Sequence, residues 1–321
     1  MTAPGPGELR LATRGSPLAL AQAGLVAATL RAAWPGLEVR LIVVVTEGDR
    51  PFRAQPGGSD GVPRSMKGVF TAGVQGAVLD GQADVAVHSA KDLPAQQVPG
   101  LVLAAVPARE DPRDVLIGPG GPLASVDELP EGARVGTGSP RRVALLGHLR
   151  PDLKPEPIRG NVDTRLRKLA AGDVDAIVLA AAGLRRLGLV DHAEPALDPA
   201  VFVPAPGQGV LAVEAREDAT RVLGLVSAAT DRPSRVALRG ERAFLARLGG
   251  SCTLPAGAWL RQGGGRLEMH GFLAGQDGAG LVRDHVAGPG DDPEGLGEGL
   301  ADRLMTAAPP AVRRLVEAAR R

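Results

Sequence analysis

Strand-length apolar runs alternate with helical stretches along the first third of the chain. The expected elements are strands over residues 9–12, 39–46 and 84–87 and helices over residues 18–33 and 71–80. Ser16 and Pro17 precede the first helix, and these residue types favour the N-cap and the first helical position. The third strand ends in the polar segment 88–92. Alternating strands and helices predict an α/β sheet.

Two short segments of this region recur later in the chain. Gly15-Ser16-Pro17 matches Gly138-Ser139-Pro140, and residues 81–87 match residues 172–178 in pattern. Chance could produce such matches, because Gly, Ala and Val are abundant. Their agreement in order favours two related lobes. In such lobes anions bind where strands end and helices begin, so we expect both Gly-Ser-Pro loops to line a cleft.

The rest of the chain contains five further expected elements and one irregular region. They are a strand over 134–136 and helices over 141–149, 162–171 and 234–248, with a last helix from Pro310. Residues 47–67 show neither a helical nor a strand period, which indicates a mobile loop. The segment after Arg232 is predicted to form a third, α+β domain.

Composition limits the partners of the protein. Lys and Arg number 37 against 36 Asp and Glu, so the net charge of +1 gives no general attraction to nucleic acid or to an anionic membrane. Aromatic residues make up 2% of the 321 residues, too few for base-stacking platforms. No apolar run is long enough for a membrane helix or suited to a signal sequence, so we expect a cytoplasmic location.

Arginines in loops are the first candidates for binding. Arginine pairs bidentately with carboxylates, and Arg14, Arg141, Arg142, Arg159 and Arg165 follow expected strands or begin expected helices. Arg141 and Arg142 oppose the dipole of their helix, and an anionic ligand would explain that placement. The alternative for each is a solvated surface charge. Arg186 is weaker, because it could simply end a helix.

Three other residues could take part in chemistry. Asp92 lies at a strand end, where a carboxylate can act as acid, base or countercharge, or can simply cap a turn. His88 fits a structural role better than that of a base. Cys252 is the one cysteine, so no intrachain disulfide forms, and it is either a reactive thiol or an inert small side chain. The spacing of Asp and His residues predicts no metal site.

Taken together, five separated segments closely resemble the porphobilinogen deaminase family. They are Leu11-Ala12-Thr13-Arg14-Gly15-Ser16-Pro17-Leu18-Ala19, His88-Ser89-Ala90-Lys91-Asp92, Ser139-Pro140-Arg141-Arg142, Arg159-Gly160-Asn161-Val162-Asp163-Thr164-Arg165 and Gly250-Ser251-Cys252. Shorter agreements are Glu110-Asp111-Pro112-Arg113-Asp114, Ala182-Gly183-Leu184 with Arg186, and Pro206-Gly207-Gln208-Gly209. The resemblance runs nearly from end to end.

The resemblance implies an α/β fold of two periplasmic-binding-protein-like (type II) lobes and a smaller α+β C-terminal domain. Its expected boundaries are 1–108 with 209–229 for lobe 1, 109–208 for lobe 2, and 230–321 for the C-terminal domain. It also implies a dipyrromethane cofactor held by a thioether to Cys252. Nothing in the sequence indicates more than a monomer. Four porphobilinogen units are added to this cofactor, each losing ammonia, and water releases the linear tetrapyrrole hydroxymethylbilane.

The same resemblance implies roles for individual residues. Asp92 is the expected catalytic aspartate, and Lys67 matches a basic residue of a lid loop, with Arg64 a substitute for a second one. The residues expected to bind cofactor or substrate are Arg14, Ser16, Lys67, Ser89, Lys91, Thr137, Ser139, Arg141, Arg142, Arg159, Gly160, Arg165, Arg186 and Gln208. Ser251 stands where the family more often has glycine, a change that should not block attachment.

Two other interpretations compete with this one. A noncatalytic two-lobed protein that binds an organic anion could use the same helix N-termini and arginines. An acyl-transfer enzyme with Cys252 as nucleophile would need a partner histidine, and none of the five histidines lies in a recognisable motif.

Overall fold

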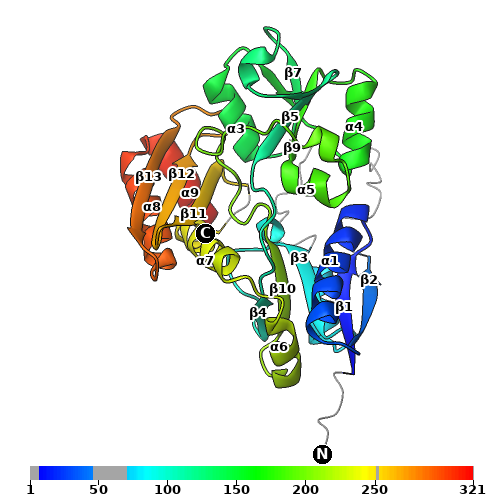
Figure 1. Cartoon of the computed structure of the whole chain (residues 1–321). Coiled ribbons are helices and arrows are strands. Elements are labelled where there is room, and N and C mark those ends of the chain that lie inside the picture. Colours follow the sequence, from blue (N-terminus) through cyan, green and yellow to red (C-terminus); the bar gives the residue numbers. More distant parts are fainter. Residues whose placement is uncertain (1–6, 46–70, 251–252, 321) are drawn as a thin grey trace, which may run out of the picture. The chain divides into compact units, whose positions relative to one another are not determined.

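The computed structural model of the chain describes residues 7–45, 71–250 and 253–320. These residues form two compact units, one of residues 1–107 with 211–230 and one of residues 108–210 with 231–321. Unit 1 and unit 2 are these two sets of residues below. Figure 1 labels their helices and strands.

Unit 1 is built on a five-stranded sheet with the strand order β2-β1-β3-β10-β4. The strands are β1 (Glu8–Arg14), β2 (Glu38–Val44), β3 (Val85–Ser89), β4 (Leu101–Ala105) and β10 (Leu211–Arg216). β1 is parallel to β2 and β3, whereas β10 runs antiparallel to β3 and β4. The carboxyl ends of β1 and β3 therefore lie at the same edge of the sheet.

Helices cover both faces of this sheet. They are α1 (Pro17–Ala33), α2 (Ala72–Leu79) and α6 (Thr220–Ser227), and the 3₁₀ turn η2 (Ala90–Asp92) follows β3. Side chains of α1 and α6 form one apolar core with Leu11 and Val87, while α2 covers a second core that contains Ala12 and Ala86. Successive strand residues point to opposite faces, which explains this division.

Unit 2 contains a second five-stranded sheet with the strand order β6-β5-β9-β7-β8. The strands are β5 (Asp114–Gly118), β6 (Gly121–Leu123), β7 (Arg134–Gly136), β8 (Lys154–Glu156) and β9 (Ala176–Ala180). β7 is parallel to β8 and β9, and β5 is antiparallel to β9. Read from β8, the order repeats that of the unit 1 sheet, with β7 in the place of β1 and β9 in the place of β3.

The helices that accompany this second sheet also repeat the first pattern. They are α3 (Pro140–Leu149), α4 (Val162–Ala170) and α5 (Ala181–Arg186), and α3 follows β7 as α1 follows β1. The short turns η3 (Val126–Glu128) and η4 (Val190–His192) lie between strands and helices of this part.

One ion pair is duplicated between the two sheets. Arg10 near the start of β1 binds Asp84 just before β3, with its Nη2 2.8 Å from Oδ1 and its backbone N–H donating to Oδ2. Arg134 at the start of β7 makes the same two contacts with Asp175 just before β9, at 2.9 Å and 2.8 Å. The sequence echoes therefore reflect two copies of one local structure.

The C-terminal part of unit 2 is a three-stranded antiparallel sheet with helices on one face (Figure 1). Its elements are α7 (Arg232–Arg247), β11 (Ala256–Gly263), β12 (Arg266–Leu273), β13 (Val282–Pro289), α8 (Pro293–Ala307) and α9 (Pro310–Arg320). Side chains from α7, α8, β11 and β12 share one apolar core. Phe272 from the other face of this sheet is fully buried in the core that also contains Leu145 of α3.

The structure confirms the expected fold class of two similar α/β lobes and an α+β C-terminal part. The helix bounds agree with the sequence prediction to within two residues, as for α1, α3 and the last helix from Pro310. The segment 172–178, which matches residues 81–87 in pattern, leads into the strand β9 at Ala176–Ala180. The predicted loop over residues 47–67 lies outside the residues that the structure describes.

The turn at Gly278, between β12 and β13, packs closely against α3. This contact can be tested by its effect on the stability of unit 2. Gly278 has a φ of 87°, and a Cβ built there would overlap the carbonyl oxygen of Ala144. We therefore expect Gly278→Ala to lower the free energy of unfolding by about 2 kcal/mol or more, measured by urea denaturation. Gly264→Ala is the matched control, because Gly264 also has a positive φ, 58°, yet has open space around it. Equal losses in both variants would contradict the proposed contact.

Candidate functional site

The predicted site residues of unit 1 lie at the carboxyl edge of its sheet. Arg14 ends β1, and the hydroxyl of Ser16 accepts a hydrogen bond from the Ala19 N–H at 3.3 Å, which caps α1. Ser89 ends the neighbouring strand β3, and the turn η2 that follows contains Lys91 and Asp92. The parallel pairing of β1 with β3 thus brings these groups to one edge. Asp92 is exposed and Lys91 is half-buried.

In unit 2, two predicted arginines converge on one buried carboxylate. Asp114 has no solvent exposure, and its two oxygens accept from Nη2 of Arg141 at 2.6 Å and from Nη2 of Arg142 at 2.7 Å. The side-chain amide of Gln208 donates to the same carboxylate at 3.0 Å. The remaining Nη1 groups of the arginines bind the backbone carbonyls of Val203 and Val178.

This arrangement corrects the argument that an anionic ligand is needed to explain Arg141 and Arg142. The two side chains are only 4% and 6% exposed, and Asp114 is their counterion within the protein. Burial by itself would raise the pKa of Asp114, but the charges of the two guanidinium groups and their hydrogen bonds lower it to about 2. One carboxylate against two guanidinium groups still leaves a net positive charge.

Arg165 adds to this positive charge. Burial lowers the pKa of its guanidinium, and the like charge of Arg142 lowers it further, so the two side chains act on one another. Its Nε donates to the carbonyl of Gly160 at 2.9 Å. Gly160 itself has a φ of 110°, and the Asn161 side chain caps α4 by accepting from the Thr164 N–H. The Arg-Gly-Asn sequence thus begins the helix, and Arg159 before it is exposed.

The polar residues before α3 have different environments. Thr137 is 1% exposed, and its hydroxyl accepts from the Ser139 N–H at 3.2 Å, so its hydroxyl has a partner within the loop. Ser139 occupies the N-cap position of α3 but its hydroxyl makes no capping bond, unlike that of Ser16. Ser139 is half-buried.

Arg186 contacts the Pro-Gly-Gln-Gly segment, to which Gln208 itself belongs. Arg186 ends α5, as the weaker sequence interpretation allowed, and its Nη2 donates to the carbonyl of Gly209 at 2.6 Å. Burial lowers the pKa of Arg186 to about 10, and the charge of Glu110 opposes this shift. Gln208 is buried, and its amide also donates to the Pro112 carbonyl.

A buried glutamate from α7 holds this segment in place. Glu241 has no solvent exposure and accepts from Arg109 at 2.7 Å, from the Gly207 N–H at 2.6 Å and from the Leu260 N–H at 2.9 Å. Arg109 also donates through Nε to the carbonyl of Gln208. A continuous polar network therefore runs from Glu241 through Gln208 to Asp114.

Sequence reasoning missed two of these residues as parts of the site. Asp114 was noted only within a matching segment, and Glu241 was not singled out. The signal available for Asp114 was an acidic residue at the start of a strand of otherwise apolar residues, where a buried charge requires a partner.

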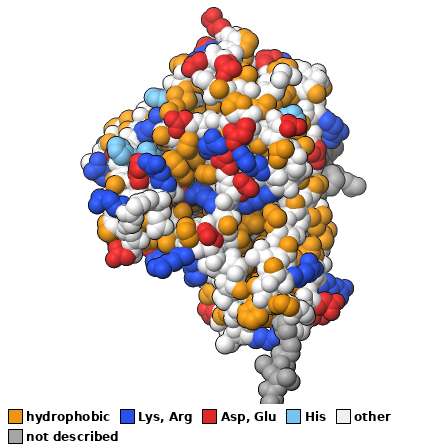
Figure 2. All heavy atoms as spheres, viewed as in Figure 1, with side chains coloured by type: hydrophobic (Ala, Val, Ile, Leu, Met, Phe, Trp, Pro, Cys, Tyr) orange, Lys and Arg blue, Asp and Glu red, His pale blue; other side chains and the backbone are white. Residues whose placement is uncertain are grey.

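The donor set of unit 2 fits a ligand that carries several carboxylates. Arg141, Arg142 and Arg165 have Asp114 as their one buried counterion among the described residues, so the positive charge that remains attracts carboxylates. Figure 2 shows charges of both signs interspersed over the face drawn, so this excess is local. Cys252 and Lys67, the expected attachment and lid residues, lie outside the residues that the structure describes.

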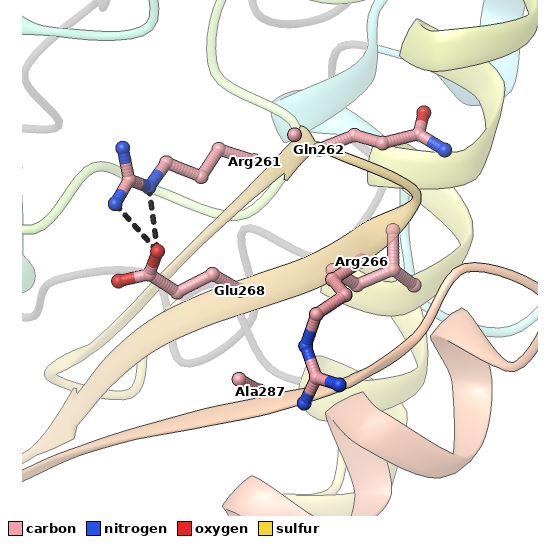
Figure 3. Close-up of a pocket in the computed structure, with 7 residues that line it drawn as sticks. Arg261, Gln262, Arg266, Glu268 and Ala287 are labelled. Carbon is pink, nitrogen blue, oxygen red and sulfur yellow. Dashed lines mark hydrogen bonds and ion pairs between the residues drawn. The ribbon is translucent and has the colours of Figure 1, made fainter.

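A pocket in the C-terminal sheet contains none of the predicted site residues. It is lined by residues of β11, β12 and β13, and Arg261 in it pairs with Glu268 (Figure 3). Across the described ranges, no three His, Cys, Asp or Glu side chains are grouped as metal ligands would be, and no helix is long and apolar enough to cross a membrane.

Comparisons with known proteins match nearly the whole chain. Residues 9–224 fit the family model "Porphobilinogen deaminase, dipyromethane cofactor binding domain", and residues 236–306 fit "Porphobilinogen deaminase, C-terminal domain". A porphobilinogen deaminase from Roseiflexus sp. (strain RS-1) is 47% identical over 302 residues, which are 92% of this chain and 95% of the relative. One from Roseiflexus castenholzii is 46% identical over 95% of this chain and 98% of the relative. Among solved structures, the methionine binding protein MetQ aligns with 16% identity and a TM-score of 0.43, over 72% of this chain and 93% of that one.

Replacing the buried carboxylate tests the polar network of unit 2. We expect Asp114→Asn to lower the free energy of unfolding at pH 7 by about 3 kcal/mol or more, because two buried guanidinium groups lose their counterion. The folded pKa lies below the ordinary 3.8, so this stabilisation is present above pH 4 and is lost as the pH falls toward 2. Urea denaturation of both proteins at several pH values should show the difference shrinking in acid.

Asp218→Asn is the control, because Asp218 forms an exposed ion pair with Arg216. It should leave the free energy of unfolding nearly unchanged. A difference between Asp114→Asn and the unmodified protein that stays constant from pH 7 to pH 2 would argue against the low pKa of Asp114.

Proposed function

This chain belongs to the porphobilinogen deaminase family, and on that basis we propose that it is a hydroxymethylbilane synthase. In the proposed reaction, four porphobilinogen molecules are joined with loss of one ammonia each. Water then releases the linear tetrapyrrole from the enzyme. The observation that carries the assignment at the level of the site is the net positive charge that surrounds Asp114 in unit 2.

That charge suits the substrate of the reaction. Each pyrrole of porphobilinogen bears an acetate and a propionate, so every addition brings two more carboxylates that must be held. Arg159 before α4 offers an exposed side chain, and Arg165 of α4 and Arg186 at the end of α5 are half-buried. Arg141 and Arg142 supply buried positive charge, and Asp114 fixes the orientation of their side chains. We assign carboxylate binding to these five arginines.

In unit 1 we assign the chemical step to Asp92. When ammonia leaves the aminomethyl group of porphobilinogen, a positive charge develops on the pyrrole, and a carboxylate nearby stabilises it. Asp92 is exposed at a strand end, so its carboxylate can reach a substrate, and it can also accept the pyrrole N–H. Arg14, Ser16, Ser89 and Lys91 lie at the same edge and are assigned to binding.

The cofactor implied by the family is a dipyrromethane, and the cationic donor set of unit 2 is compatible with its carboxylates. When bound, it supplies the pyrrole position to which the first substrate is joined. We propose that Cys252 forms the thioether and that Thr137, Ser139, Gly160 and Gln208 contribute contacts around the cationic residues. Lys67 is proposed to act from the segment before α2. The domain boundaries, the cytoplasmic location and the monomeric state remain predictions from the sequence.

A covalent cofactor predicts a measurable mass. Intact-mass spectrometry of the purified protein should show one dipyrrole adduct, because the thioether survives denaturation. Cys252→Ala should lack both the adduct and the activity, while it keeps the far-ultraviolet circular dichroism of the folded protein. An unmodified protein with full activity would refute the attachment.

Removing the charge of Asp92 tests the chemical assignment. We expect Asp92→Asn to keep the stability of the parent, because Asp92 is exposed, yet to slow ammonia release from porphobilinogen by about a hundredfold or more. Asp80→Asn, at the end of α2 away from this strand end, is a control with the same chemical change. Turnover of Asp92→Asn close to that of the control would remove Asp92 from the mechanism.

A further inference from the structure

Three polar side chains are buried beneath α2 in unit 1. Glu214 of β10 accepts from the side-chain amide of Gln75 of α2 at 2.7 Å, and Nε2 of His88 of β3 lies 3.2 Å from the same Oε2. The three residues are only 4% to 5% exposed. No function has been assigned to them above, and we refer to them as the polar trio.

The trio is unusual for its surroundings. The trio lies beside an apolar core under α2 that contains Ala12, Val74 and Val78. An ionisable pair in such a place costs desolvation energy, and apolar side chains of similar volume often serve stability as well or better. Stability alone therefore does not account for the trio.

Its position relates it to the proposed chemical group. His88 is four residues before Asp92, and the strand that contains it leads directly into the turn η2. Glu214 and His88 lie on neighbouring antiparallel strands, because Ala212 pairs with His88 and Glu214 with Ala86. The hydrogen bond from Gln75 joins α2 to β10. Glu214 in turn lies within ion-pair distance of Nε2 of His88, outside hydrogen-bond geometry, and this contact joins β10 to the end of β3.

The face on which the trio lies is also that of a binding residue. Ala12 of β1 pairs with Ala86 of β3, and both belong to the core under α2. Both strands continue for at least two more residues, so the same register brings Arg14 level with His88. Because side chains two apart share a face, Arg14 and His88 are on the α2 side.

We propose that Glu214, oriented by Gln75, is a positioning residue that holds His88 and so sets the place of the Ser89–Asp92 segment in the reaction. The inference rests on the assignment of Asp92 made above. Glu214 does not touch substrate in this account. It acts through the strand end, and a misplacement of about 1 Å in a reacting group can cost about a hundredfold in rate.

The test compares variants of the purified holoenzyme. Glu214→Leu removes both contacts at similar volume, and we expect kcat to fall about tenfold or more while KM for porphobilinogen changes by less than about twofold. Glu214→Gln keeps an oxygen that accepts from Gln75 and a group that reaches His88, so it should recover most of the rate. Intact mass should show the dipyrrole adduct in both.

Val78→Ala is the matched control, because Val78 lies one turn after Gln75 on α2 and in the same core. It should lower the free energy of unfolding without the fall in kcat. If Glu214→Leu does not fold, Gln75→Leu and Glu214→Gln provide the same comparison, with a fall in kcat expected for Gln75→Leu alone.

Three results would overturn the inference. The first is a wild-type kcat in Glu214→Leu, or in Gln75→Leu if Glu214→Leu does not fold, while Asp92→Asn is inactive. This result would leave the assignment of Asp92 intact. Another is an equal fall in kcat in Val78→Ala, which makes lost stability the cause. Near-normal turnover of Asp92→Asn would remove the assignment of Asp92, and the inference with it.

Discussion

The buried carboxylate of Asp114 is the constraint on which the organisation of unit 2 depends. Two guanidinium groups cannot be held beside one another in a protein interior unless an anion offsets their repulsion and their loss of hydration. Asp114 does this at 2.6 Å and 2.7 Å, and the carbonyls of Val203 and Val178 take further donors. The two side chains are thereby fixed in orientation, and half of their charge remains available to act on other anions.

This anchor extends into the C-terminal part of the chain. Gln208 reaches Asp114 with its side chain, while its carbonyl accepts from Arg109, which in turn pairs with Glu241 of α7. Because Glu241 also binds the Gly207 N–H, the turn that carries Gln208 is held at both backbone and side chain. The α+β part of unit 2 therefore contributes to the position of Gln208 and of the predicted binding residues around Asp114.

Local patterns in the sequence were sufficient to predict elements such as α1, α3 and β7, whereas the strands β5 and β10 and the helix α6 were not predicted. The Gly-Ser-Pro loops and the 81–87 and 172–178 runs identified two copies of one sheet, which the strand orders confirm. What the sequence could not supply were contacts between distant residues. No sequence pattern near Asp114 indicates that Arg141 and Arg142, 27 and 28 positions away, bind its carboxylate. Glu241 is separated from Arg109 by 132 positions, and only the folded chain brings them together.

The paired Arg10–Asp84 and Arg134–Asp175 contacts stand at the amino ends of the parallel strands, away from every residue assigned to binding or chemistry. The same ion pair thus stabilises the same position in both sheets, and we call it the brace of the shared sheet framework. Since the brace does not involve the opposite edge, residues there could diverge without weakening the framework. The place of Asp92 in the first copy is taken by Gly183 in the second, and the arginine pair of the second corresponds to Leu18 and Ala19 in the first. At this edge the two copies of one scaffold therefore carry different charges, the carboxylate of Asp92 in the first and the guanidinium groups of Arg141 and Arg142 in the second.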